Sequence, residues 1–539
     1  MNDYQKIKNA KKGEMVSIVR NFDNFPDPVS YFSRLTDYGR RENSLLLESA
    51  DIVSKYGERS IGAINPCLKV TGQGKKFQVT ALNPTGNFFL GELYDDLAFC
   101  EQLKHTDRSI IGVLKPEKNI LNEEERLKSR NHFELLRTIN NKFTPQTDQF
   151  SQYGGLFGAI SYDMIDQFED LPAAQKDIIQ DPDYEMYYVD NLFVMDHTKG
   201  EMLILANALI TEQDRDQLYI DCIKKINEYE EHLAGKDPEI QIPGHKKPPI
   251  STDTSRAEFI DRVKQLKQHI RKGDIFQAVL SRTITAKSDL PPYYVYSRLR
   301  EINPSPYMFY IKDEEGCLLG ASPEMFVRVE GQDEKKVEIR PIAGTKPRGL
   351  INGKIDRDLD SRYELELKLD PKEQAEHTML IDLARNDVAR VSKTGSRYVD
   401  EPLIIEKYSH VQHLVSNVSG ILKDDLDALH AYLASMNMGT LTGAPKIEAM
   451  KLLRKYEKTK RGFYGGAVGY FTPGGDFDSC IVIRSMRFKN KKAYIRVGAG
   501  IVHDSDPEKE WQETIKKASA CLEALEIDID YENVNKEAK

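Results

Sequence analysis

The stretch from Gly462 to Lys517 constrains the fold more than any other part of this sequence. It runs from GFYGGAVGYF through the strand-like segments DSCIVIRSMRF and KKAYIRVGAGIV to DSDPEKEWQETIKK. This order predicts a Gly-rich turn, two strands, a small-residue turn at residues 498–500 and a helix. Glu510, Glu513 and Lys517 are spaced three and four residues apart, so they share one face of that helix. Such a layout suits a metal site made of carboxylates beside an anion pocket.

Composition argues against several classes of protein. The 539 residues, 40% of them apolar, are enough to bury a large core and to form roughly two to four domains. A net charge of -9 argues against a nucleic-acid-binding protein, whose binding face would be basic. No apolar run reaches the roughly 18 residues of a membrane helix, and the first residues contain no apolar signal core. Six cysteines without a CxxC pair indicate neither disulfides nor a zinc site, so we expect a soluble, cytoplasmic protein.

The sequence divides at a segment rich in proline and charge. Residues 236–254 (KDPEIQIPGHKKPPISTDT) have the composition of a linker. Before it, strand-like segments are followed by a helical pattern that starts near Thr211 and ends before Gly235. We therefore expect an amino-terminal domain over residues 1–235, a linker over 236–254 and a second domain over 255–530.

The second domain opens with a strong helix signal. Ser255 and Glu258 form a capping box, and Gly273 can end the helix. The strand IFQAVLSRTIT follows, and it carries Gln277 among apolar residues. A polar residue at such a position is usually only a hydrogen-bonded strand-end residue.

Two helices of the second domain are predicted to begin in the same way. Asp-Pro pairs at residues 370–371 and 506–507 place an acidic N-cap before proline at the first helical position. In the first of these helices, Glu373 falls in the first turn and Glu376 one turn later. Capping and dipole compensation alone would account for Glu373. Two pairs of carboxylates on two such helices could instead hold Mg²⁺.

Blocks of sequence in the second half match a known family in that family's order. They read GDIFQAVLSR, NPSPYMFY, GASPEMFVR, IRPIAGTKPRG, DPKEQAEHTMLIDLARNDVARV, YSHVQHLVS, GTLTGAPK, RGFYGGAVGYF, SCIVIRS and GAGIVHDSDPEKEWQET. By these blocks the chain resembles the chorismate-binding enzymes and, within them, the large subunits (component I) of anthranilate synthases. LLLESAD and GGLFGAISYD extend the resemblance over nearly the whole chain. The implied fold is α+β, with large antiparallel-rich sheets packed face to face, helices outside, and the two sequence halves interleaved.

The resemblance implies the first committed step of tryptophan biosynthesis, in which chorismate and ammonia give anthranilate and pyruvate. Members of this group obtain ammonia from glutamine through a separate glutamine amidotransferase subunit (component II), so a hetero-oligomer is expected. No segment of this sequence resembles an amidotransferase, and no cysteine lies in a Gly-rich nucleophile turn. Nucleic acid and membranes are not expected as partners.

The resemblance also implies the site residues. Glu376 and Glu513 would bind Mg²⁺, with Glu373 and Glu510 close by and partly acting through water. Contacts to the substrate would come from Gly344, Thr345, Tyr464, Arg484, Gly498, Ala499, Gly500 and Lys517. Three residues have implied catalytic roles: Glu324 as general acid, His413 as base or elimination-assisting group, and Thr440 against the ring. Without the matching blocks, Arg484 would more often be an ion-paired strand residue and His413 a satisfied core histidine.

Two positions separate this chain from related enzymes. Enzymes that add water to chorismate carry lysine at the position of Gln277, and a neutral amide cannot act as a base near pH 7. Aminodeoxychorismate synthases carry lysine at the position of Ala343. An enzyme that stops at aminodeoxyisochorismate shares both features of this chain and remains an alternative. An inactive tryptophan-sensing subunit is a further alternative, which the retained glutamates argue against.

Feedback inhibition by tryptophan is the last implication of the resemblance. The expected pocket joins LLLESAD of the first half to NPSPYMFY and GGAVGYF of the second. Its predicted residues are Glu48, Ser49, Pro306, Tyr307, Met308, Val468 and Tyr470. An ordinary contact between domains is the alternative interpretation.

Overall fold

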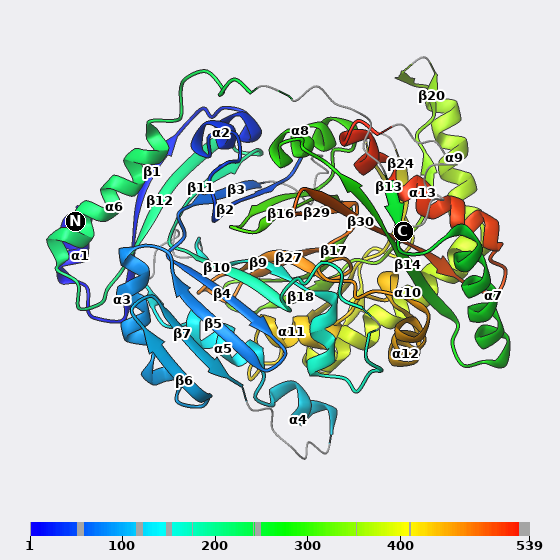
Figure 1. The fold of residues 1–539 in the computed structure, drawn as a ribbon, viewed down its shortest axis with the longest axis horizontal. Helices are drawn as coiled ribbons and strands as arrows, with labels where there is room; N and C mark the ends of the chain where they lie inside the picture. The colour runs from blue at the N-terminus through cyan, green and yellow to red at the C-terminus, as the bar shows by residue number, and fades with distance from the viewer. Residues whose placement is uncertain are drawn as a thin grey trace.

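The protein is described by a computed structural model, which is shown in Figure 1. The structure describes residues 2–50, 59–114, 122–146, 153–174, 176–240, 242, 250–351, 353–408 and 411–527. Two large, almost entirely antiparallel sheets pack face to face, and most helices lie outside them (Figure 1). Leu45, Phe157, Phe309 and Val468, from both sheets, belong to one buried apolar cluster. The predicted α+β class is confirmed.

Each large sheet contains strands from both sides of the predicted linker. The first has the order β13 (Ile250–Thr252), β14 (Gln277–Lys287), β30 (Lys492–Ile501), β29 (Ser485–Lys489), β16 (Gly316–Ser322), β15 (Tyr307–Lys312), β2 (Ser44–Glu48), β3 (Arg59–Ile64), β11 (Asn191–Asp196), β12 (Glu201–Leu209), β1 (Glu14–Phe22) and β8 (Thr144–Pro145), with β26 (Gly443–Ala444) beside β14. The second has the order β22 (Tyr398–Val399), β25 (Val418–Ile421), β18 (Lys336–Ile339), β17 (Met325–Glu330), β28 (Phe477–Ile481), β27 (Ala467–Phe471), β9 (Gly155–Ile160), β10 (Tyr184–Val189), β4 (Leu68–Gln73), β5 (Lys76–Ala81), β7 (Ser109–Val113) and β6 (Glu101–Thr106). The two halves of the chain therefore meet within both sheets, at the β2–β15 and β9–β27 pairs.

Smaller elements complete the fold. A third sheet joins β19 (Ile342–Pro347), β24 (Val411–Val415) and β23 (Ile404–Lys407), and β20 (Leu350–Ile351) pairs with β21 (Lys354–Ile355). The helices are α1 (Asp3–Asn9), α2 (Pro28–Leu35), α3 (Pro84–Leu93), α4 (Glu123–Lys128), α5 (His132–Asn140), α6 (Arg215–Glu230), α7 (Arg256–Lys272), α8 (Pro292–Ile302), α9 (Arg357–Leu369), α10 (Pro371–Val391), α11 (Ala428–Ser435), α12 (Lys446–Tyr456) and α13 (Pro507–Ala524). Within the described ranges, none of these helices has the length and apolarity that crossing a membrane requires.

The predicted helix signals of the second half are confirmed. Ser255 and Glu258 form the capping box of α7, and Gly273 ends that helix at φ +84°. Asp370 accepts hydrogen bonds from the first amides of α10, and Asp506 does the same for α13. In the predicted linker, residues 241 and 243–249 lie outside the described residues, so the domain boundaries stay predictions.

Three predictions about local structure were wrong. Helix α6 begins at Arg215, with Asp214 as its cap, and not near Thr211. Residues 498–500 are not a turn, because they pair along β30 with Val279–Ser281 of β14. DSCIVIRSMRF is not one strand: β28 and β29 belong to different sheets, and Arg484 at φ +50° lies between them. The positive φ of Arg484 changes the direction of the backbone where the chain passes from one sheet to the other.

Candidate active site

Four glutamates on α10 and α13 form the first part of the candidate site. Burial raises the pKa of Glu376, and the charges of Glu373 and Glu513 raise it further. Burial and the charge of Glu513 also raise the pKa of Glu510. The carboxylates thus lie close enough to repel one another. Among the described residues, no three metal-ligand side chains are close enough to form a ready coordination shell. The mutual repulsion and the oxygen donors nevertheless suit a hard cation such as Mg²⁺.

Gln277 lies against this carboxylate group. Its side chain is 2% exposed, and its Nε2 donates a hydrogen bond of 3.3 Å to Oε1 of Glu376. Its Oε1 has no hydrogen-bond partner among the described residues. A Cβ atom on Gly500 would lie 2.9 Å from Nε2 of Gln277. Glycine at this position therefore allows β30 to approach Gln277 and Glu376 closely.

Two positively charged side chains lie beside residues 498–500 of β30. Nζ of Lys517 lies 2.6 Å from Oε1 of Glu513 and donates a hydrogen bond of 3.1 Å to the carbonyl of Gly498. A Cβ atom on Gly498 would lie 3.2 Å from the hydroxyl of Tyr464. The guanidinium group of Arg484 forms no ion pair or hydrogen bond with the described side chains. Burial lowers the pKa of Arg484, whereas Tyr464 and Glu513 are near enough to raise it in part.

Glu324 is a buried acid between β16 and β17. It is 5% exposed, and burial raises its pKa from 4.5 to about 8. The nearby side chain of Thr440 and the backbone of Ile342 offset only part of this rise. Two atoms lack a well-formed hydrogen bond to the described residues: Oε1 of Glu324 and Oγ1 of Thr440. Glu324 is therefore protonated at neutral pH and has a proton to donate.

His413 on β24 is the candidate base. Its Nδ1 lies 2.9 Å from Oγ1 of Thr345 and 3.4 Å from the carbonyl oxygen of Gly344. Burial lowers its pKa to about 4, so the ring is neutral at pH 7 and can accept a proton. A Cβ atom on Gly344, at φ +68°, would lie 2.8 Å from Oε2 of Glu373. The strand pair that carries His413 thus packs directly against the carboxylate group.

A buried ion network beneath the site was missed by the sequence analysis. Glu457 is paired with Arg461 at 2.7 Å and with Arg496 at 3.0 Å. Oε1 of Glu457 also accepts hydrogen bonds from the amide and hydroxyl of Ser281 on β14. The network ties β14 to β30 directly below Tyr464. The arginine within the apolar run AYIRVGA was the signal that could have revealed it.

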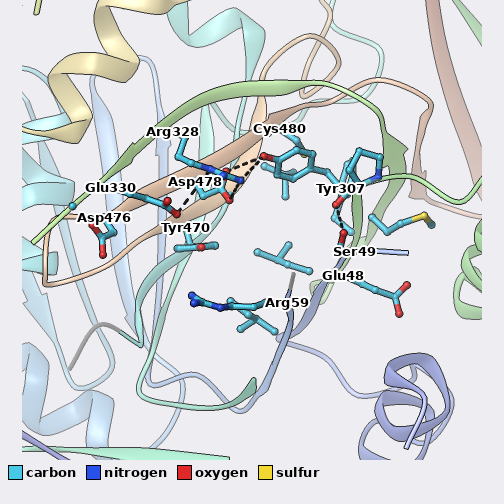
Figure 2. A pocket seen from close by; sticks show the side chains of 18 of the residues that line it. Glu48, Ser49, Arg59, Tyr307, Arg328, Glu330, Tyr470, Asp476, Asp478 and Cys480 are labelled. Atoms are coloured by element: carbon cyan, nitrogen blue, oxygen red, sulfur yellow. Dashed lines mark hydrogen bonds and ion pairs between the residues drawn. The ribbon is translucent and has the colours of Figure 1, made fainter. Parts of the chain in front are cut away.

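A separate cavity of about 430 Å³ lies between β2, β15 and β27 (Figure 2). It is lined by every residue predicted for tryptophan: Glu48, Ser49, Pro306, Tyr307, Met308, Val468 and Tyr470. The hydroxyl of Ser49 donates to the carbonyl of Pro306 at 2.9 Å, and that of Tyr307 donates to Asp478 at 3.2 Å. The carboxylate of Glu48 instead points away from the cavity, toward Arg300 at 2.7 Å (Figure 2).

Comparison with known proteins gives a consistent result. A family model described as "chorismate binding enzyme" matches residues 97–523. Anthranilate synthase component 1 of Vibrio cholerae serotype O1 is 43% identical over 503 residues, which are 93% of this chain and 94% of that protein. The Escherichia coli K12 protein of the same name is 41% identical over 506 residues, with the same coverage. The crystal structure of anthranilate synthase component I from Streptococcus pneumoniae superposes with a TM-score of 0.66 at 30% identity, covering 87% of this chain and 93% of that chain.

Proposed function

This chain belongs to the chorismate-binding enzymes, and on that basis we propose that it is the synthase subunit of a cytoplasmic anthranilate synthase. It would convert chorismate and ammonia to anthranilate, pyruvate and water. One observation supports this assignment most strongly: an arginine without an ion-pair partner among the described residues, a protonated carboxyl group and a group of glutamates lie around residues 498–500 of β30. A dianionic substrate that must lose a hydroxyl group needs these three features together.

Different residues of the site bind the substrate, donate a proton and assist removal of a proton. Arg484 and Tyr464 hold one substrate carboxylate beside the backbone of residues 498–500. Glu324 donates a proton to the departing hydroxyl group, and neutral His413 assists removal of a ring proton. Gln277 cannot activate water, which leaves ammonia as the nucleophile.

Mg²⁺ is proposed as the cofactor. Glu376 and Glu513 would hold it, with Glu373 and Glu510 beside them. Burial raises the pKa values of Glu373, Glu376 and Glu510, and Glu513 adds an oxygen donor that Lys517 holds in place. When bound, the ion supplies positive charge for the ring carboxylate of the substrate. Among the chain's own residues, Gln277 fixes one oxygen of Glu376, and Lys517 orients Glu513.

Comparing ammonium salt with glutamine as the nitrogen source tests the proposed function. The purified chain, given chorismate, Mg²⁺ and ammonium salt at alkaline pH, should form anthranilate. The same chain given glutamine instead should form none, because no segment of its sequence resembles a glutamine amidotransferase. Anthranilate is detected by its fluorescence, and glutamine-dependent product from the highly purified chain would contradict the proposal.

Tryptophan is proposed as the ligand of the cavity in Figure 2. Tyr470, stacked on Phe157 at 5.2 Å between ring centroids, offers an apolar face for an indole ring. The cavity also contacts Cys480 at the end of β28, four residues before Arg484. A ligand there would shift Arg484 if it bound the inhibited arrangement more tightly than the active one.

Replacing Ser49 with phenylalanine should relieve this inhibition. The larger side chain fills part of the cavity, so the tryptophan concentration for half inhibition should rise by about 100-fold or more, as expected for a steric block. Activity without tryptophan should stay within about twofold, because Ser49 touches none of the catalytic residues. Ser49→Ala is the matched control and should remain inhibited. Unchanged inhibition of Ser49→Phe would count against this cavity.

A further inference from the structure

One buried arginine lies on the sheet face opposite the candidate active site. Arg282 on β14 shares a strand face with Leu280 and Ile284, which belong to the apolar cluster that α7 and α13 cover (Figure 1). Gln277 and Ser281 lie on the other face of the strand, toward the site. Arg282 therefore does not touch the substrate, although it belongs to a strand that borders the site.

Arg282 is buried without an acidic partner. Its side chain is 0% exposed, and no ion pair joins it to the residues that the structure describes. Burial lowers its pKa to about 9, so the guanidinium group still carries its charge at pH 7. Its Nη2 has no hydrogen-bond partner among the same residues. An apolar side chain would fill this position at a lower desolvation cost, which indicates a role that apolar packing alone does not supply.

The guanidinium group of Arg282 joins the sheet to one turn of α13. Its Cζ lies 3.8 Å from the ring centroid of Trp511, and its Nε donates a hydrogen bond of 3.1 Å to Oγ1 of Thr514. The hydroxyl of Thr514 in turn donates to the carbonyl of Trp511 at 2.7 Å. Nη1 of the arginine donates at 3.2 Å to Oγ1 of Thr252 on β13. Trp511 also packs on Phe259 of α7, with 5.5 Å between the ring centroids.

The same turn of α13 carries two of the glutamates proposed for Mg²⁺. Glu510 directly precedes Trp511 in the sequence, and Glu513 directly precedes Thr514. Because neighbouring residues of a helix are fixed relative to one another, a rotation of α13 about its axis would move both carboxylates. Glu376 lies on a different helix, α10, so its separation from the other two glutamates depends on how α13 is held.

We propose that Arg282 is a positioning residue for Mg²⁺, which sets the rotation of α13 and thereby places Glu510 and Glu513 relative to Glu376. The inference rests on the part of the proposed function that assigns Mg²⁺ to these glutamates. Apolar contacts are non-directional and tolerate a small rotation of a helix. Hydrogen bonds from a planar guanidinium group to two hydroxyls do not. Since Mg²⁺ requires nearly ideal octahedral geometry, its affinity should depend on Arg282.

The test measures Mg²⁺ binding apart from catalysis. The full chain is titrated with MgCl₂ without chorismate, and the rise in its thermal midpoint gives the apparent dissociation constant. Arg282→Met keeps a long apolar stem and should raise this constant by about 10-fold or more. Thr514→Val removes one hydroxyl and should raise it by about threefold. Arg256→Met is the matched control: it removes the exposed Arg256–Glu508 ion pair between α7 and α13 and should leave the constant unchanged.

Activity with ammonium salt gives a second measurement. The Mg²⁺ concentration for half-maximal anthranilate formation should rise for Arg282→Met, while kcat at saturating Mg²⁺ stays within about threefold of the wild type. Both results together would separate placement of the Mg²⁺ ligands from a direct part in the reaction.

Several outcomes would decide against the inference. A lower thermal midpoint of Arg282→Met with an unchanged dissociation constant for Mg²⁺ would assign Arg282 to stability alone and overturn it. If Arg282→Met does not fold, unchanged Mg²⁺ binding by Thr514→Val would overturn it instead. A wild-type chain that does not bind Mg²⁺ would overturn both the inference and the proposed cofactor. A wild-type chain that binds Mg²⁺ but forms no anthranilate would overturn the proposed function, and raised dissociation constants of the two variants would still support the inference.

Discussion

Replacing Glu324 with glutamine is expected to lower kcat of the ammonium-dependent reaction by about 10²- to 10⁴-fold. The substitution keeps the shape of the side chain and removes the proton that the departing hydroxyl group needs. Because burial raises the pKa of Glu324 to about 8, the wild-type carboxyl group is protonated at pH 7. Wild-type activity, measured at a fixed concentration of free ammonia, should therefore fall as pH rises through about 8. The glutamine variant should lack this dependence.

Stability gives an independent readout for the same variant. The pKa of Glu324 is raised on folding, so its protonated form favours the folded state. This contribution to the free energy of unfolding is complete below pH 4.5 and is lost as the pH rises to about 8. Glutamine has no charge to bury, and Glu324→Gln should thus unfold at a higher temperature than the wild type above pH 8. Glu338→Gln, on β18 beside Lys336, is the matched control and should change kcat little. Activity of Glu324→Gln within about threefold of wild type would contradict its role as the acid.

Replacing Arg484 with lysine is expected to lower kcat/KM for chorismate by about 30- to 1,000-fold, or roughly 2–4 kcal/mol. Lysine keeps the charge but cannot form the two parallel hydrogen bonds that a guanidinium group gives a carboxylate. The thermal midpoint should hardly change, because no ion pair to a described residue is broken.

Arg487 provides the contrast for Arg484. It lies three residues further along and is paired with Asp181 at 3.0 Å and Asp313 at 2.8 Å. Arg487→Lys should therefore lower the thermal midpoint more than it raises KM. If Arg484→Lys lost stability but kept its KM, Arg484 would be a structural residue and not a substrate contact.

Much of the architecture could be predicted because its signals are local. The α7 capping box and the Asp-Pro starts of α10 and α13 are set by neighbouring residues, and the structure has them as expected. The placement of residues 498–500 could not be predicted in this way. Glycine favours turns when only its neighbours are considered, but pairing with β14 holds this segment in β30.

Contacts between residues far apart in the sequence account for the other differences between the sequence-based predictions and the structure. The apolar alternation around Arg484 reads as one strand, and only the separation of β28 and β29 into two sheets reveals the left-handed residue between them. The network around Glu457 joins a local partner, Arg461, to Arg496, which lies 39 residues away from Glu457 in the sequence. The direction of the Glu48 carboxylate depends on Arg300 of α8 in the same way. In α9, sequence alone does not reveal that Leu365 and Leu369 are exposed whereas Leu367 is buried.

Measuring both products of one reaction tests the proposed anthranilate synthase activity. The purified chain is incubated with chorismate, Mg²⁺ and ammonium salt, and anthranilate fluorescence and pyruvate are followed together. We expect the two products in a 1:1 ratio, and no anthranilate when glutamine replaces ammonium. Pyruvate without anthranilate would indicate a lyase that uses water, and chorismate consumed without pyruvate would indicate a synthase that stops at an amino-substituted intermediate. Either result would contradict the proposed function.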